Sequence, residues 1–500
     1  MTDTSPRGAE DAVAQVHTPP LGAHASGKWT NGVVSLEYEA TAEWLPLRRK
    51  ERPVAEIFSV SYTVDAPDRP VVFVFNGGPG GASAFLHLGA VGPRRIDLPG
   101  DGSLPAMPPR LVNNDESWLA VADLVFVDPV GTGFSRVVDG APGSGEAVDP
   151  EHYFGHLRDL DSFSEFIGRW LSAHRRWGSP VFLAGESYGG YRVGRLVRHI
   201  QETAGVGLTG AILISPALEL SALTGSDYDV LRWVDMLPTM VAAAVHHGRS
   251  RAFEPGTPLA EVLAEAEEFA TGDYATFLIR GASMPAEDSG RVLARLAELT
   301  GIPLDVVTRV GGRLTSKTFS RELLRDQRKV LTTNDAALVA IDPFPDREPY
   351  AGPDLGESGI ISAYTAGINE WLRNEIGVET ERDYVLLNKD VTNAWREDAP
   401  PVRDFPHFFR QPPGATDDLR YAMSLNPALR VLVVHGRHDL STPYYASTRL
   451  RNLMRLSSAA EARLTVRHVA GGHMFYSWES SRREFADMVG AFIEDEAMPG

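Results

Sequence analysis

The stretch VFLAGESYGGYRVGRLVRHI, residues 181–200, changes its pattern of apolar residues at a single serine, Ser187. Its first residues form a continuous apolar run, which is typical of a strand buried on both faces. Beyond the serine, apolar residues recur at the spacing of one helix face, at Val193, Leu196, Val197 and Ile200. The sequence therefore predicts a strand that turns into a helix at Ser187, and Gly185 and Gly189 give a strained turn the room it needs.

Ser187 has the surroundings of a catalytic nucleophile. A strand-to-helix turn lifts the hydroxyl above the sheet, and the helix N-terminus favours negative charge that develops there. The Gly-x-Ser-x-Gly pattern alone is a weak signal in a chain with 47 glycines. The strand before it and the helix after it supply the context that the motif requires. We therefore predict that Ser187 is the nucleophile, and a serine with a purely structural role is the alternative.

The partners of such a serine are expected further along the chain. The nucleophile needs a base and the base needs an orienting acid, and in α/β-hydrolases the order along the chain is Ser, acid, His. VLVVHGRHDLSTP (431–443) places Asp439 in a loop after a strand, and LTVRHVAGGHMFY (464–476) places His473 in a glycine-rich loop after another. We predict Asp439 as the acid and His473 as the base. We interpret four other candidates as structural: His435, His438, His468 and Asp128.

A glycine-rich loop follows an earlier apolar run in VVFVFNGGPGGASAF, residues 71–85. An oxyanion hole draws one N–H from the residue after the nucleophile and another from an early strand-to-helix loop. Four glycines around Pro79 allow the backbone to approach an oxyanion with no Cβ in the way. A phosphate-binding loop is the alternative, but the segment lacks the Gly-Lys-Ser/Thr ending of that motif.

Other apolar runs are spaced as alternating strands and helices, and they include DLVFVD (123–128), GAILIS (210–215) and RVLVVHG (430–436). This spacing predicts an α/β fold with a mostly parallel central sheet flanked by helices, and the family resemblance described below implies the α/β-hydrolase fold. We predict that residues 31–220 form the first part of this core and residues 416–500 the second. Amphipathic helices between them, at 221–415, predict a large helical insertion that caps the core. Residues 1–30 are polar with Pro, Gly and Ser, and a disordered tail is expected.

The composition of the 500 residues narrows the classes of function. The 66 acidic and 48 basic side chains give a net charge of −18, which argues against nucleic acid and anionic membrane surfaces as partners. The chain has no cysteine, so disulfides, thiolate nucleophiles and Cys-ligated metals are excluded. The first residues lack the apolar segment of a signal peptide, and no apolar run is long enough to span a bilayer. A cytoplasmic location is therefore expected.

Five motifs, in this order, resemble the serine carboxypeptidase family of the α/β-hydrolase superfamily. They are NGGPGGAS (76–83), SWLAVADLVFVDPVGTGFS (117–135), GESYGG (185–190), HGRHD (435–439) and GGHM (471–474). Two further segments, residues 38–65 and 319–326, resemble a bacterial branch of the family. The resemblance implies release of C-terminal amino acids from peptide substrates through an acyl-enzyme, with no metal or organic cofactor. Family members are sometimes dimers, so a homodimer is one option.

The resemblance also implies roles for individual residues. Ser187, Asp439 and His473 match the catalytic triad, Gly78 and Tyr188 match the two N–H donors of the oxyanion hole, and Asn76 and Glu186 match groups that bind the terminal carboxylate of the substrate. A protonated Glu186 can donate a hydrogen bond to that carboxylate, and both burial and a neighbouring anion raise the pKa of a carboxyl group. The alternative is that Glu186 only structures the turn.

Three positions depart from the eukaryotic pattern of the family. Ala90 stands where that pattern has a second Glu that pairs with the first, Val74 replaces a Trp, and Gly81 replaces a Cys. Groups that recognise the substrate carboxylate are therefore missing. We hypothesise that Arg94 or Arg95 replaces them, because an Arg holds a carboxylate with paired hydrogen bonds. A role as ordinary surface arginines is the alternative.

Other functions fit parts of the same pattern. An esterase or acyltransferase on the same scaffold would use the same triad, since esters and amides share the acyl-enzyme. A catalytically inactive binding protein would keep the fold without the chemistry, although the complete triad and glycine-rich loop argue against it. The sequence thus predicts a hydrolase, a serine-type carboxypeptidase, with an esterase or acyltransferase as the alternative.

Overall fold

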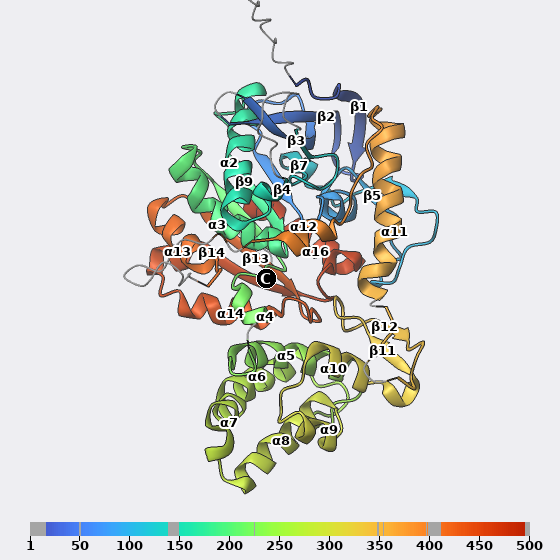
Figure 1. Ribbon diagram of the computed structural model, residues 1–500, viewed down its shortest axis with the longest axis vertical. Helices are drawn as coiled ribbons and strands as arrows, with labels where there is room; N and C mark the ends of the chain where they lie inside the picture. The colour runs from blue at the N-terminus through green and yellow to red at the C-terminus, as the bar shows by residue number, and fades with distance from the viewer. Residues whose placement is uncertain are drawn as a thin grey trace, which may run out of the picture.

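The apolar runs of the chain form neighbouring strands of one sheet in the computed structural model (Figure 1). The structure describes residues 17–49, 52–138, 150–224, 226–347, 350–353, 355–396, 398 and 412–495. Six strands pair in parallel, in the order β7 (Asp123–Val127), β4 (Val71–Phe75), β9 (Val181–Glu186), β10 (Gly210–Ile214), β13 (Arg430–Gly436) and β14 (Leu464–Val469). This arrangement confirms the predicted mostly parallel sheet.

Antiparallel strands extend the sheet beyond β7. They are β1 (Ala23–Thr30), β2 (Ser35–Arg49) and β3 (Arg52–Thr63), and the short strand β8 (Arg136–Val137) also pairs with β3. The predicted disordered tail, residues 1–30, is therefore wrong for its last part, while residues 1–16 lie outside the described residues. The polar composition misleads here because β1 is an edge strand. Its backbone pairs along the whole of β1 with β2, and a single large apolar residue, Trp29, anchors it in the core.

Trp29 ties this edge strand to the rest of the molecule, and its replacement is expected to destabilise the fold. The side chain is fully buried, and its indole N–H donates to the Asn114 carbonyl at 2.6 Å. Trp29→Phe keeps most of the ring but removes one of the two hydrogen bonds to that carbonyl, which then accepts only from the Ser117 N–H, so we expect the free energy of unfolding to fall by about 1 kcal/mol. Val33→Ala, in the exposed turn before β2, should change it by less than about 0.5 kcal/mol. Urea unfolding of both variants measures this, and equal stabilities would contradict the role of Trp29.

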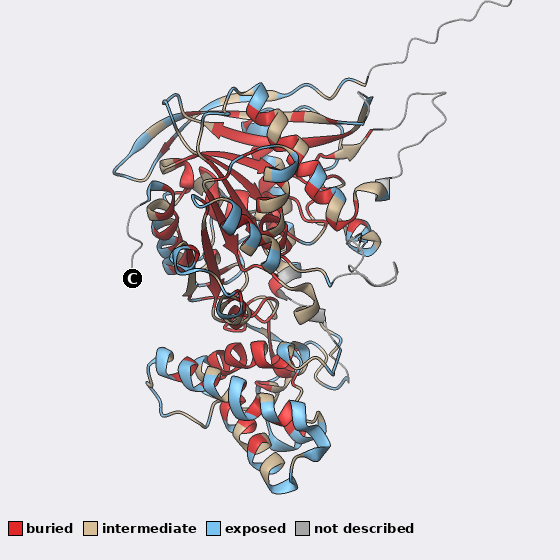
Figure 2. Ribbon diagram, turned by 90° about the vertical axis from the view of Figure 1, so that its left-hand side faces the viewer, coloured by how far each residue is buried: buried red, intermediate tan, exposed pale blue. Residues whose placement is uncertain are grey.

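Helices cover both faces of the sheet, because successive residues of each strand point to opposite sides. On one face lie α2 (His156–Ala173), α3 (Tyr188–Thr203) and α13 (Thr416–Leu425), which bury their apolar sides with those of the central strands. On the other face lie α11 (Leu355–Asn369) and α16 (Glu479–Glu494). Figure 2 shows buried residues concentrated in the strands and on the sides of the helices that face them. The remaining core elements are α1 (Ala84–Leu86), α4 (Leu220–Thr224), α12 (Lys389–Ala394), α14 (Tyr444–Leu453), α15 (Ser458–Glu461), β5 (Arg94–Ile96) and β6 (Leu111–Asn113).

A helical lobe lies below the sheet in Figure 1, and its apolar core also includes Leu440, Tyr444 and Tyr445 from the loop and helix that follow β13. It is formed by α5 (Leu231–His246), α6 (Leu259–Phe269), α7 (Ala275–Arg280), α8 (Ala286–Thr300), α9 (Leu304–Arg309) and α10 (Ser316–Glu322), and the hairpin of β11 (Lys329–Leu331) and β12 (Val339–Ile341) follows it. In the described part of the chain, no helix is both long enough and apolar enough to span a bilayer.

The predicted insertion at 221–415 does not remain in this lobe. Helix α11 and the segment after it return to the core, where Tyr364, Trp371 and Leu386 are buried against the sheet face that α16 also covers. The amphipathic pattern identified the lobe helices α6 and α8, but such a pattern says only that one side is buried and not which partner buries it. The insertion therefore consists of a lobe, up to the hairpin, and a second part that belongs to the core.

Candidate active site

Ser187 occupies the corner between β9 and α3, with the strained backbone that its position requires. Its φ of 61° and ψ of −122° lie outside the usual regions for a residue with a side chain, and such strain persists only where the surroundings hold it. Its N–H donates to the Ile214 carbonyl of β10 at 2.9 Å. A Cβ on Gly185 would overlap the carbonyl of Gly189, which explains why glycine stands on both sides of the corner.

The loops after β13 and β14 bring Asp439 and His473 together. The distance from His473 Nδ1 to Asp439 Oδ2 is 2.7 Å, and the Asp439 side chain is fully buried. Its Oδ1 accepts hydrogen bonds from the N–H groups of Ser441 and Thr442 at 2.8 and 2.9 Å, and the Thr442 hydroxyl donates to Oδ2 at 2.7 Å. The carboxylate is thus held in one orientation. It keeps the proton of His473 on Nδ1 and leaves Nε2 free to act as a base.

One residue that sequence analysis missed, Ser215, links the loops that carry Asp439 and His473. It follows β10 directly, and its Oγ donates to the His473 carbonyl at 2.8 Å. Its own carbonyl oxygen lies 2.9 Å from the Thr442 hydroxyl oxygen, and its N–H donates to the carbonyl of Val434 in β13 at 2.8 Å. The signal that could have identified it is its position, since polar residues at the carboxyl ends of parallel strands meet at one edge of the sheet.

Glu186 and His473 influence each other electrostatically. Burial raises the pKa of Glu186 to about 7, although His473 and the hydrogen bonds from Tyr476 and Asn76 oppose this rise. Burial lowers the pKa of His473, but the charges of Asp439 and Glu186 outweigh it and raise this pKa to about 9. When Glu186 is neutral, one of the charges that raise the pKa of His473 is absent. His473 then loses its proton at a lower pH and can act as a base there.

The two residues expected to form the oxyanion hole, Gly78 and Tyr188, each offer a backbone N–H. Neither N–H donates to a backbone carbonyl or a side chain within the described part of the chain. Gly78 has a φ of +113°, which a residue with a side chain rarely adopts. A Cβ on the preceding Gly77 would lie 2.6 Å from the N of Tyr188. The glycine-rich loop thus lies directly against the start of α3, where two N–H groups can stabilise an oxyanion.

The segment that returns from the insertion braces this loop from outside. The N–H of Asn388 donates to the Gly80 carbonyl at 2.8 Å, and the N–H of Ala82 donates to the Leu386 carbonyl at 2.9 Å. The Thr392 hydroxyl donates to the Pro79 carbonyl at 2.6 Å. The loop is therefore held between α3 on one side and residues 386–392 on the other.

Asn76 and Glu186, expected to act together on a substrate carboxylate, are in contact. Asn76 Nδ2 donates to Glu186 Oε2, and the orientation of the amide is set because Asn76 Oδ1 accepts from the N–H of Leu86 at 2.9 Å. The hydroxyl of Tyr476, a residue that sequence analysis did not single out, donates to Glu186 Oε1 at 2.9 Å. Glu186 is 3 % exposed. A buried acid directly before the nucleophile is therefore fixed by two donors.

The structure separates Arg94 from Arg95, because neighbours on strand β5 point to opposite sides. Arg94 lies beside Tyr38 of β2, where its charge and hydrogen bond lower the Tyr38 pKa that burial raises. Arg95 donates to the Ile96 carbonyl at 3.2 Å, and its buried Nε has no hydrogen-bond partner in the described chain. In that part of the chain, neither arginine is hydrogen-bonded to Glu186 or Asn76. The hypothesis that one of them binds the substrate stays a prediction.

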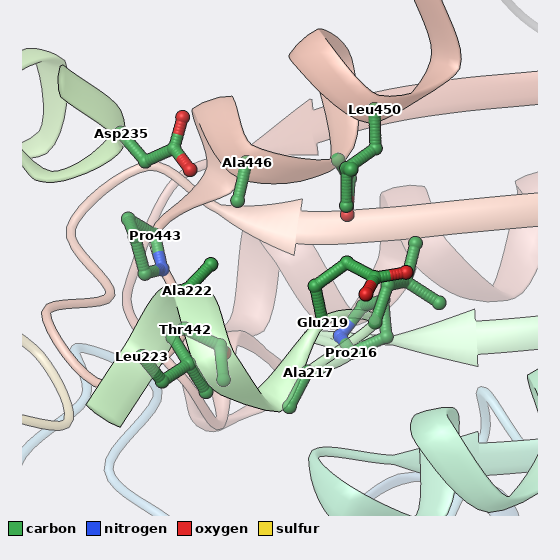
Figure 3. Close-up of a pocket in the computed structure, with 12 residues that line it drawn as sticks. Pro216, Ala217, Glu219, Ala222, Leu223, Asp235, Thr442, Pro443, Ala446 and Leu450 are labelled. Atoms are coloured by element: carbon green, nitrogen blue, oxygen red, sulfur yellow. The ribbon is translucent and has the colours of Figure 1, made fainter. Parts of the chain in front are cut away.

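Pockets border the loop that carries Asp439. The pocket in Figure 3 lies between the end of β10 and α14, is lined mainly by apolar side chains and includes Thr442. A second pocket, of which Ser441 and Thr333 form part of the lining, lies where the lobe meets this loop, and Arg232 and Lys317 reach it from the lobe. Within the described residues, no group of three or more His, Asp or Glu side chains is arranged to hold a metal ion.

Comparisons with known proteins agree with this geometry. Residues 57–229 match the family model described as serine carboxypeptidase. The pheromone-processing carboxypeptidase KEX1 of Colletotrichum graminicola is 33% identical over 137 residues, which are 27% of this chain and 19% of that protein. Serine carboxypeptidase-like 5 of Arabidopsis thaliana is 28% identical over 198 residues, 37% of this chain and 41% of that protein. The chain thus spans about a fifth to two fifths of the length of these curated relatives.

A solved structure extends the likeness in fold to nearly the whole chain. The crystal structure of Kex1 from Saccharomyces cerevisiae, described as a prohormone-processing carboxypeptidase, aligns with a TM-score of 0.56 and 15% sequence identity, over 92% of this chain and 91% of that one. Such a likeness shows the fold. This chain therefore has the α/β-hydrolase fold, and its segment 57–229 matches the sequence model of the serine carboxypeptidase family.

Proposed function

We propose that this protein is a serine carboxypeptidase, which releases single amino acids from the C-termini of peptides. The observation that carries the proposal is the place of Glu186: a buried acid that directly precedes the nucleophile and is held by Asn76. The terminal carboxylate of the substrate lies one residue beyond the bond that is cleaved, so the group that recognises it must lie close to the nucleophile. Glu186 directly precedes Ser187 and can bind that carboxylate when its own carboxyl group is protonated.

We infer the following reaction for these side chains. His473 takes the proton of the Ser187 hydroxyl at Nε2, and Ser187 attacks the carbonyl of the last peptide bond. The N–H groups of Gly78 and Tyr188 stabilise the oxyanion that forms. His473 then gives its proton to the nitrogen of the leaving amino acid, and the acyl group stays on Ser187. Water, activated by the same histidine, attacks the acyl-enzyme and restores the hydroxyl.

Recognition of the substrate is expected to depend on the protonation of Glu186. A neutral Glu186 donates a hydrogen bond to the substrate carboxylate, whereas an ionised one repels it. Burial raises the pKa of Glu186 to about 7, so the neutral form predominates at pH values below that. We therefore expect KM for a peptide with a free C-terminus to be constant in mildly acidic solution and to rise about tenfold for each pH unit above 7.

Mass spectrometry of an N-blocked peptide mixture, incubated with the protein from acidic to slightly alkaline pH, tests both statements. Loss of single C-terminal residues that is absent in Ser187→Ala supports the proposal. Peptides that stay intact while simple esters are cleaved would instead indicate an esterase or acyltransferase, the alternative that the missing second acid at Ala90 favours. Failure of Ser187 to react with a fluorophosphonate probe would point to an inactive binding protein.

Two finer assignments remain predictions. Membership of a bacterial branch rests on residues 38–65 and 319–326, whereas the relatives named above are fungal and plant proteins. The homodimer that the resemblance allows would be tested by analytical ultracentrifugation, with a sedimentation coefficient that rises with protein concentration as the supporting result.

A further inference from the structure

Tyr476 connects two parts of the site that come from distant places in the chain. It lies three residues after His473, in the short 3-10 helix η8 (Phe475–Ser477), and it is fully buried. Its hydroxyl donates to Glu186 Oε1 at 2.9 Å, while Asn76 donates to the other oxygen of the same carboxyl group. The acid is therefore held from both sides, and one of the two donors belongs to the segment that carries the histidine.

We propose that Tyr476 is a positioning residue, which orients the carboxyl group of Glu186 and sets the pH range in which that group can receive a substrate carboxylate. The inference rests on the proposed carboxypeptidase function, which it deepens. The hydroxyl does not need to touch the substrate for this role. It acts through Glu186, whose oxygen it occupies and whose ionised form it stabilises.

The geometry around Tyr476 indicates that the site is built to hold its ring in place. A Cβ on Gly89 would lie 2.7 Å from Cε2 of Tyr476 and 2.5 Å from the hydroxyl of Tyr364, so glycine at this position leaves room for both rings. The carbonyl of Tyr476 accepts a hydrogen bond from Arg482 of α16 at 3.2 Å. Ring and backbone are thus fixed independently, and the hydroxyl has one direction in which to donate.

Several charged or titratable groups face Glu186, and each comes from a different element. His473 and Asp439 follow β14 and β13, Tyr476 lies in η8, and the hydroxyl of Tyr364 in α11 is buried without a hydrogen-bond partner in the described chain. Burial and the charge of Glu186 raise the pKa of Tyr364, and the charges of Arg482 and Arg95 oppose this rise. Of these groups, Tyr476 is the one whose hydroxyl donates directly to the carboxyl group.

Removal of that donor should change the protonation of Glu186 in a definite direction. A hydrogen bond from a hydroxyl favours a carboxylate over the neutral acid, whereas burial favours the neutral acid. In Tyr476→Phe one of the groups that oppose the effect of burial is lost, while His473 and Asn76 remain, so the pKa of Glu186 rises. The loss of a hydrogen bond to a charged group corresponds to a shift of about one to two pH units. The rise of KM for a free-acid peptide should therefore move to higher pH by that amount.

Tyr364→Phe is the matched control, because it removes a neighbouring buried hydroxyl that does not bond to Glu186. The protonation of Glu186 is followed directly by infrared titration of the carboxyl C=O band that is missing in Glu186→Gln. A shift of this band and of the KM profile in Tyr476→Phe, but not in Tyr364→Phe, supports the proposal. An unchanged band, or an equal shift in both variants, overturns it.

The same experiment separates this inference from the proposed function. If the infrared band shifts in Tyr476→Phe but no variant, nor the wild-type protein, releases amino acids from peptides, the positioning role stands and the carboxypeptidase assignment fails. If the wild-type protein is an active carboxypeptidase and the band does not move, the assignment stands and the role of Tyr476 fails. Near-ultraviolet circular dichroism of each variant verifies that the folded structure is retained.

Discussion

The Asp439→Asn variant is expected to lose about four orders of magnitude in kcat. The carboxylate of Asp439 accepts hydrogen bonds at both oxygens, from two backbone N–H groups, the Thr442 hydroxyl and His473. An asparagine side chain in its place has an NH₂ group where one of the two carboxylate oxygens was, and this group cannot accept hydrogen bonds from the donors on that side. If that group faces His473, Nδ1 must lose its proton to accept a hydrogen bond, and the proton moves to Nε2. The histidine can then no longer take the proton of Ser187.

Asp128→Asn provides the control for this experiment. Asp128 is also a buried acid after a strand, and burial raises its pKa to about 7, so an asparagine resembles its neutral form. Its Oδ1 accepts from Ser83 and Tyr384, whereas Oδ2 has no partner in the described residues. We expect kcat for this variant to stay within about tenfold of wild type, since the residue touches no reacting group. Stopped-flow measurement of ester hydrolysis compares the two, and equal losses would argue against Asp439 as the triad acid.

Gly77→Ala is expected to lower kcat by about a thousandfold, which is the effect of losing an oxyanion-hole donor. Its Cβ would lie 2.6 Å from the N of Tyr188 and 2.7 Å from the carbonyl oxygen of Glu186. Both atoms are backbone at the elbow, so neither can turn aside as a flexible side chain would. The glycine-rich loop must move away from α3, and the N–H of Gly78 moves with it.

The control is Gly207→Ala, because nothing lies within 4 Å of a Cβ at that position. This variant should match the wild-type protein in kcat and in thermal midpoint. Gly77→Ala should retain a folded structure by circular dichroism and react slowly with the fluorophosphonate, whose tetrahedral oxygen also needs the hole. Unaltered kinetics in Gly77→Ala would show that the oxyanion is held elsewhere.

Sequence patterns were sufficient to predict the site residues that have a reactive side chain and also follow an apolar run. Ser187, Asp439 and His473 each follow an apolar run, and such runs in an alternating α/β chain converge at one edge of a sheet. The structure brings the latter two together and places Ser187 at the predicted corner. The parallel sheet was predictable for the same reason, since its strands are buried on both faces and read as continuous apolar segments.

The residues that escaped prediction depend on contacts between distant parts of the chain. Tyr476 has no distinguishing pattern, and its role becomes visible only through its bond to Glu186, which lies 290 positions away. Trp29 sits in a polar segment that becomes a strand because β2 offers it a free edge. The packing of Tyr364 against the sheet could not be predicted either, because the spacing of apolar residues shows that one helix face is buried but not which surface covers it.

The brace on the glycine-rich loop has a consequence for the order in which a newly made chain becomes active. Residues 386–392 hold that loop, yet they are synthesised some three hundred residues after it. Most of the sheet can assemble earlier, because seven of its ten strands precede residue 187, namely β1, β2, β3, β4, β7, β8 and β9. The acid and the base follow later still. The proposed hydrolytic activity would therefore arise only after residues 386–392, Asp439 and His473 have been made, and a chain that ends before residue 386 would carry Ser187 without these groups.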